Sequence, residues 1–137
     1  MTDTYTRRHL RLGWWTLFAV VGLGLGLALL RVFDVEAYLH PANDTRRLMW
    51  TLAHGHGAVM GLLHILFGVS FTLTPALAPQ APRLPSRALT AAGLLLPVGF
   101  FLGGVSFYGG DPGLGILGVP LGAVCLLVAV VATARGR

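Results

Sequence analysis

The chain alternates between long apolar stretches and short segments that carry its charges. Four stretches contain no Asp, Glu, Lys or Arg: residues 12–30, 48–74, 88–110 and 112–134. A helix of about 20 apolar residues crosses the ~30 Å hydrocarbon core of a bilayer. Backbone polar groups in lipid must be paired internally, so each stretch is predicted to be helical. The pattern predicts an all-α, four-transmembrane-helix bundle with spans at about 12–32, 48–74, 87–109 and 112–134.

The four spans use nearly all of the 137 residues, so we expect a single domain, 1–137. Charged residues make up only 11% of the chain, against about 25% in soluble proteins. The net charge of +5 raises the question of nucleic-acid binding. The arginines are scattered at the ends of the spans, however, as topology signals are. The expected partner is therefore the lipid bilayer and not a nucleic acid.

The arginines are divided unequally between the two ends of the predicted bundle. One end has seven: Arg7, Arg8, Arg11, Arg83, Arg87, Arg135 and Arg137. The other end has three: Arg31, Arg46 and Arg47. Because cytoplasmic loops carry an excess of basic residues, both termini are predicted to lie in the cytoplasm. The first span is interpreted as a retained helix, since its apolar run is long and no small-residue cleavage site follows.

Residues at the ends of the spans suggest helix caps. Asp111 precedes Pro112, a combination typical of an N-cap followed by the first helical residue, so we predict that it opens the fourth span. Ser86 is predicted to cap the third span. Thr74 and Pro75 are predicted to end the second span and to begin a proline-rich connector.

The second stretch carries three histidines, His54, His56 and His64, within eleven residues. Ionisable residues inside a membrane are a default hypothesis for a functional site. At 100° per residue, His54 and His56 point 200° apart and cannot bind one ion from an ideal helix. His54 shares its face with Gly57 and Gly61, which leave that face bare.

Three interpretations fit these faces. An imidazole above a bare face suits an axial haem ligand, so His54, His56, Gly57 and Gly61 form the candidate cofactor-binding set. His56, Met60 and His64 lie on another face and form a soft-ligand set suited to Cu(I). His56 and His64 are ~12 Å apart along the axis, so Met60 would have to bridge them. The third interpretation is that the histidines simply hydrogen-bond across helix interfaces.

The string His54-Gly55-His56-Gly57-Ala58-Val59-Met60-Gly61 follows the pattern H-x-H-x4-G. It resembles the second helix of small bacterial four-helix membrane proteins that are similar to the catalytic subunit of haem–copper oxidases. The resemblance implies that His54 is an axial ligand of haem b in the bacterial inner membrane. Thr51 stands where that superfamily usually has Arg, and spans three and four contain no His. A second ligand would come from His64, a Met or another protomer, which implies a homo-oligomer or a larger membrane complex.

The leading functional hypothesis is a small integral membrane module that binds haem b or a quinol near His54 and His56 within an electron-transfer assembly. The alternative is a transporter or channel that moves protons or Cu(I) along Met49, His56, Met60 and His64. A third possibility is a structural membrane subunit with packed histidines. The sequence shows no evident nucleophile–base pair, paired carboxylates or thiolate site, so we do not expect independent catalytic activity.

Overall fold

The computed structural model describes residues 2–73 and 82–135, and it consists almost entirely of helices. The long helices are α1 (Thr2–Val32), α3 (Asp44–Leu73), α4 (Arg83–Val105) and α5 (Gly118–Arg135). Each is long and apolar enough to cross a membrane. The short elements are α2 (Glu36–Leu39), η1 (Pro41–Asn43), β1 (Phe107–Tyr108), β2 (Asp111–Pro112) and η2 (Leu114–Leu117). The predicted all-α four-helix bundle is confirmed.

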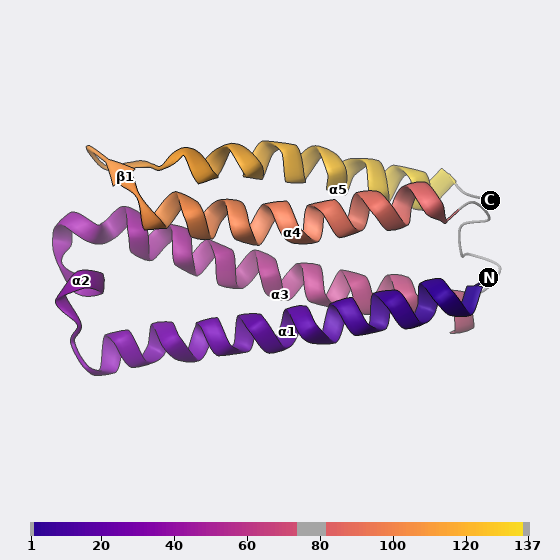
Figure 1. Ribbon diagram of the computed structural model, residues 1–137, viewed down its shortest axis with the longest axis horizontal. Helices are drawn as coiled ribbons and strands as arrows, with labels where there is room; N and C mark the ends of the chain where they lie inside the picture. Colours follow the sequence, from indigo (N-terminus) through magenta and orange to yellow (C-terminus); the bar gives the residue numbers. More distant parts are fainter. Residues whose placement is uncertain (1, 74–81, 136–137) are drawn as a thin grey trace.

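The long helices lie side by side in the order α1, α3, α4, α5, each running opposite to the one before it (Figure 1). The central helices α3 and α4 are buried along a larger share of their length than α1 and α5. Both termini lie at one end of the bundle, which we call the terminal end, and α2 and the β1–β2 hairpin lie at the other (Figure 1). That the terminal end is cytoplasmic stays a prediction.

Three helices begin earlier than the apolar stretches predict, and one of them is α3, which begins at Asp44, four residues before position 48. α1 begins at Thr2, ten residues before position 12, so the first three arginines belong to the helix. α4 begins at Arg83, after Pro82 at its N-cap, and it accommodates Pro85 in its first turn, where a missing N–H is tolerated. Ser86 therefore lies inside the helix and is buried, and the prediction that it caps the helix is wrong. The predicted connector at 74–81 lies outside the described residues.

The predicted cap at Asp111 is also wrong, because the chain turns back on itself there. Tyr108 pairs with Asp111 across a two-stranded hairpin, and the linking residues Gly109 and Gly110 both have positive φ. Two positive φ angles are typical of tight hairpin turns, and Gly adopts them without strain. The chain then forms η2, and α5 begins only at Gly118.

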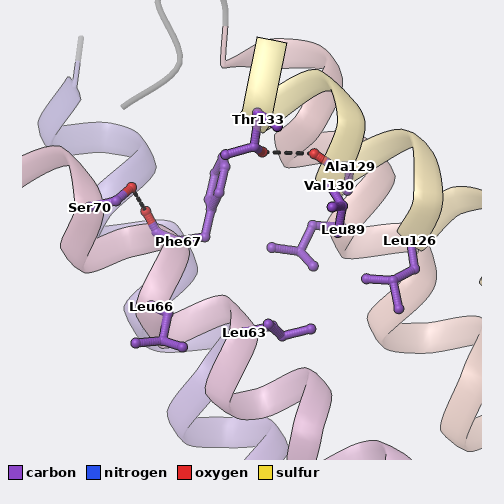
Figure 2. Close-up of a pocket in the computed structure, with 10 residues that line it drawn as sticks. Leu63, Leu66, Phe67, Ser70, Leu89, Leu126, Ala129, Val130 and Thr133 are labelled. Carbon is purple, nitrogen blue, oxygen red and sulfur yellow. Dashed lines mark hydrogen bonds between the residues drawn. The ribbon is translucent and has the colours of Figure 1, made fainter. Parts of the chain in front are cut away.

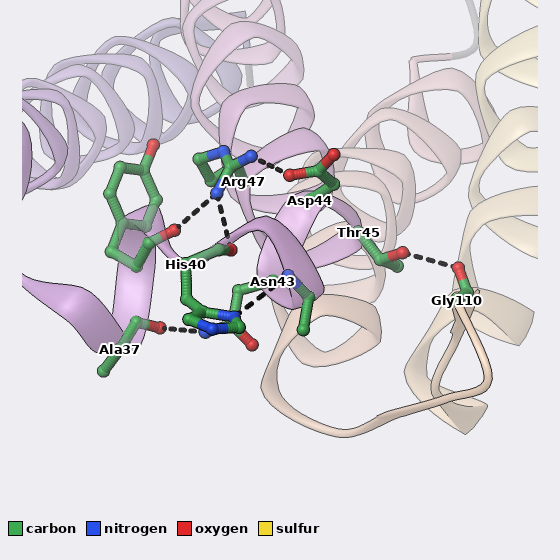
Figure 3. Close-up of polar contacts among 9 residues, drawn as sticks. Ala37, His40, Asn43, Asp44, Thr45, Arg47 and Gly110 are labelled. Carbon is green, nitrogen blue, oxygen red and sulfur yellow. Dashed lines mark hydrogen bonds and ion pairs between the residues drawn. The ribbon is translucent and has the colours of Figure 1, made fainter.

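Polar contacts tie the loops to the helices at the end opposite the termini (Figure 3). Arg47 donates hydrogen bonds to the carbonyl oxygens of Tyr38 and His40, both at 3.0 Å, and forms an ion pair with Asp44. Thr45 donates a hydrogen bond to the carbonyl oxygen of Gly110 in the hairpin. These contacts fix α2 and the hairpin against the start of α3.

Arg46 adds a second anchor between α3 and α4. Its Nε donates to the carbonyl oxygen of Gly104 at 3.2 Å, and Nη1 donates to that of Ala37 at 2.7 Å. Its guanidinium also lies over the rings of Trp50 and Phe107, at 5.6 and 5.2 Å from their centroids. A cation over aromatic faces is held electrostatically as well as by its hydrogen bonds. Arg46 of α3 thus contacts α2, α4 and β1 at this end of the bundle.

Candidate functional site

His54 and His56 face different neighbours. The Nδ1 of His54 lies 2.8 Å from the carbonyl oxygen of Val20 in α1. The Nδ1 of His56 lies 2.9 Å from the carbonyl oxygen of Leu52, and its ring is 4.6 Å from that of Phe100 in α4. Because a carbonyl oxygen only accepts, Nδ1 carries the hydrogen in both rings. The two side chains diverge, as their helical separation predicts.

The bare glycine face of α3 is covered by α1. Gly57 faces the side chain of Val20, and Gly61 faces that of Leu17. The ring of His54 itself lies against Gly24, where an added Cβ would be 2.5 Å from the imidazole Cε1. The face that the haem hypothesis assigns to a macrocycle is therefore filled by α1 in this structure.

The stripe of His56, Met60 and His64 runs along α3, but its members have different partners. Met60 is 1% exposed and packs in the core with Ala92 and Leu96 of α4. His64 turns toward α1. Within residues 2–73 and 82–135, no three His, Cys, Asp or Glu side chains are grouped so that they could hold a metal ion. Any copper bound along the stripe would therefore depend on Met60.

The most complete polar cluster lies nearer the terminal end and joins three helices. His9 of α1 places its Nδ1 2.8 Å from the Nδ1 of His64 in α3. The Nε2 of His9 lies 2.8 Å from the Oγ of Ser86 in α4. His9 and Ser86 are 0% exposed and His64 is 2% exposed. We call this hydrogen-bonded cluster the His–His–Ser chain.

Close helix packing surrounds the His–His–Ser chain. An added Cβ on Gly68 would lie 3.3 Å from the Cβ of His9, and one on Gly93 would lie 2.7 Å from the Nε2 of His64. The ring of Phe67 meets the ring of His9 edge-on, with the centroids 4.6 Å apart. The two glycines let α1 and α4 approach α3 closely enough for the imidazoles to bond across the interfaces.

Phe67, whose ring contacts that of His9, also lines an apolar groove between α3 and α5. Figure 2 shows Phe67 in this groove. The groove has a volume of about 360 Å³ and is almost wholly apolar. Its polar groups are engaged locally: Ser70 donates to the carbonyl oxygen of Phe67, and Thr133 donates to that of Ala129. The residues drawn along it include Leu63, Leu66, Leu89, Leu126 and Val130. The groove is thus suited to hydrocarbon, because its hydroxyl hydrogens are already donated within their own helices.

The hydrogen bonds of the His–His–Ser chain can run in two directions. In one, Ser86 donates to His9, and His9 donates to His64. In the other, His64 donates to His9, and His9 donates to Ser86. In either case only one hydrogen lies between the Nδ1 atoms of His9 and His64. The two imidazoles therefore keep this bond when one of them gains a further proton at its Nε2. The cluster can therefore bind and pass on a proton without separating the helices.

The order Ser, His, His is also the hydrogen-bond order of a nucleophile, its base and an orienting group. The sequence alone did not indicate such a pair, because Ser86 and His9 are 77 residues apart. Ser86 has no exposed surface, however, so no substrate carbonyl can reach its Oγ in this structure. Proton transfer fits the burial of the cluster better than nucleophilic attack.

Sequence reasoning missed His9 because it lies among arginines, outside the uncharged stretch. A usable signal was the spacing of His9, Gly13 and Val20, which are the buried residues within Thr4–Val32 of α1. Their spacing of four and then seven residues keeps them on one face of a helix. Extending the first span back to His9 would have placed this histidine on the face of α1 that meets α3.

Comparison with known protein families, curated proteins and solved structures gave no match.

Proposed function

We propose that this protein is a small multi-pass membrane protein that binds a proton at the His–His–Ser chain and passes it into the bundle. The observation that carries the proposal is the 2.8 Å contact between two buried imidazoles, continued by a 2.8 Å contact to Ser86. Ionisable side chains are costly inside a membrane and commonly mark proton or ion pathways. Proton movement was one of the functions that the sequence suggested, along Met49, His56, Met60 and His64, of which His64 belongs to the His–His–Ser chain.

The depths of the three residues support a path that leads inward from the terminal end. At 1.5 Å per residue, Ser86 is ~4.5 Å from the start of α4, and His9 is ~10 Å from the start of α1. His64 is ~13 Å from the described end of α3. Because Ser86 is buried, the transfer begins only when water at the terminal end reaches its Oγ. The proton that this water delivers displaces the hydroxyl hydrogen onto His9. His9 then gives its Nδ1 hydrogen to His64, which releases its own from Nε2.

The apolar core beyond His64 determines whether proton transfer is continuous or gated. Met60 lies one turn further along α3 and is packed against Leu96. Neither side chain relays a proton, so an open hydrogen-bonded pore does not continue past His64 along this face. The proposal is therefore one of gated transfer, in which proton release to the far side accompanies a change in the packing of α3 against α4.

Proton flux into liposomes tests the proposal. The full chain is reconstituted around a pH-sensitive dye, and a potassium diffusion potential drives protons inward. Because a positioned proton-transfer group typically contributes about 10²–10⁴-fold, His9→Gln and His64→Gln should each lower the initial rate at least tenfold. Glutamine retains hydrogen bonding but does not carry a proton at neutral pH. His56→Gln, a histidine outside the cluster, is the matched control and should keep the wild-type rate.

Three results would contradict proton transfer at this site. The first is a wild-type flux equal to that of empty liposomes. The second is an unchanged flux in both glutamine variants, with melting temperatures showing that they are folded. The third is covalent labelling of Ser86 by a fluorophosphonate, which would favour a nucleophilic role.

A haem b or quinol module in an electron-transfer assembly is the second candidate function, and one observation favours it. His54 donates its Nδ1 hydrogen to Val20, which leaves a lone pair on Nε2. Metal-bound histidines usually donate their other ring hydrogen to such a carbonyl. Since α1 covers the neighbouring glycines, binding would require α1 to move. A Soret band after haem supplementation, lost in His54→Ala, would support this candidate, and its absence would count against it.

A further inference from the structure

Three arginines gather on one arc of α1 at the terminal end. Arg7 and Arg11 are 40° apart around the helix, and Arg8 lies 60° beyond Arg11, so all three fall within about 100°. All three are exposed, and they line a surface pocket together with Thr4 and Leu12. We call this group the arginine cluster.

The arginine cluster is distant from the acidic side chains that the structure describes. These are Asp34, Glu36, Asp44 and Asp111, all at the opposite end of the bundle. The ion pair recorded among the described residues, between Arg47 and Asp44, is also there. With Asp3 counted from the sequence, three arginines against one carboxylate leave the start of α1 with a net charge of +2. The cluster therefore retains charge for an anionic ligand.

Two apolar grooves lead away from the arginine cluster. One begins at Leu12 and continues between α1 and α4, past Trp15, Ala19 and Phe101. The other begins at Arg11 and follows the outer surface of α1 past Trp14, Trp15 and Phe18. Trp15 belongs to both grooves and is 68% exposed. The two grooves thus start beside the same positive charges and run on either side of one indole.

From this arrangement we propose that the terminal end of α1 binds an anionic phospholipid. The phosphate would lie on Arg7, Arg8 and Arg11, and the two acyl chains would follow the two grooves on either side of Trp15. A free phosphate would use only the arginines and would leave both grooves unused. Interfacial arginines and tryptophans are well suited to this contact, because the former attract anionic headgroups and the latter lie at headgroup depth.

Native mass spectrometry of the full chain in a neutral detergent tests the proposal. Dioleoyl phosphatidylglycerol should remain bound, whereas dioleoyl phosphatidylcholine should not. A basic residue near the surface contributes about 1 kcal/mol to the attraction, so the double variant Arg7→Gln/Arg11→Gln should bind phosphatidylglycerol about 30-fold more weakly. Arg83→Gln/Arg87→Gln removes the same charge from the same end of the bundle but from α4, outside the arginine cluster, so it should weaken binding much less than the first double variant does.

The contribution of the grooves is measured separately. Trp15→Ala should weaken the binding of phosphatidylglycerol while the three arginines are intact, and inorganic phosphate alone should not raise the melting temperature. Equal binding of the two lipids would overturn the proposal, and so would an equal loss in the two double variants. Stabilisation by inorganic phosphate that matches that of the lipid would instead indicate a simple anion site.

Discussion

The bond between His9 and His64 can be measured by a double-mutant cycle. His9→Leu removes two side-chain hydrogen bonds, to His64 and to Ser86, whereas His64→Leu removes only the shared one. Hydrogen bonds between membrane helices contribute about 0.6 kcal/mol on average and about 1.7 kcal/mol at most. His9→Leu should therefore lower the free energy of unfolding by about 1.2 kcal/mol and His64→Leu by about 0.6 kcal/mol, since each removed bond costs the average amount.

The double variant carries the decisive information. Once His9 is replaced, the bond to His64 is already lost, so the double variant should be about as stable as His9→Leu alone. The two substitutions should thus be coupled by between about 0.6 and 1.7 kcal/mol. Unfolding of the purified protein by dodecyl sulfate in mixed micelles measures these free energies. If the loss of unfolding free energy in the double variant equals the sum of the two single losses, to within about 0.3 kcal/mol, the contact is refuted. The pair His9 and His56 provides an additive control.

Three further substitutions and one control test the packing and the loops. Gly13→Ala would place a Cβ 2.7 Å from the backbone oxygen of Gly61, so overpacking should lower stability by about 1–3 kcal/mol in the same unfolding assay; Gly22→Ala meets nothing within 4 Å and should not. Arg46→Gln removes the bond to Gly104 and the contacts with two aromatic rings, so the hairpin should be cleaved faster in limited proteolysis, and an unchanged rate would show that Arg46 does not hold it. Asp111→Ala, in an exposed strand that caps no helix, should change the melting temperature little, and a large loss would restore the capping role.

The four spans could be predicted because lipid imposes a severe constraint. In lipid, a segment without charges for about 20 residues has few alternatives to a helix, so the hydrophobic pattern alone was sufficient to predict the spans. The divergence of His54 and His56 was predictable for a similar reason, since it depends only on the rise and turn of one helix. Features set within a single helix were therefore accessible from the sequence.

The features that depend on contacts between helices were not accessible in this way. The His–His–Ser chain requires α1 to continue through a basic segment and α4 to begin at Arg83, and neither follows from hydrophobicity. Ser86 and Asp111 were assigned as caps from residue preference. In each case the neighbouring chain decided otherwise, through Pro82 before α4 and the glycine turn before Asp111.

The partnership between α1 and α3 also bears on how the chain enters the bilayer during synthesis. α3 has the lowest mean hydropathy of the four spans, 1.6 against 2.7 for the span that contains α5, and it carries three histidines. α1 precedes α3 in the chain, so it emerges from the ribosome before α3, and it presents the acceptor for His54 and the partner of His64. Polar groups that would be costly for α3 alone are thus met by a helix that is already in place. The two helices are therefore suited to insert as a hairpin, in which α1 supplies hydrogen-bond partners to α3 as α3 leaves the translocation machinery.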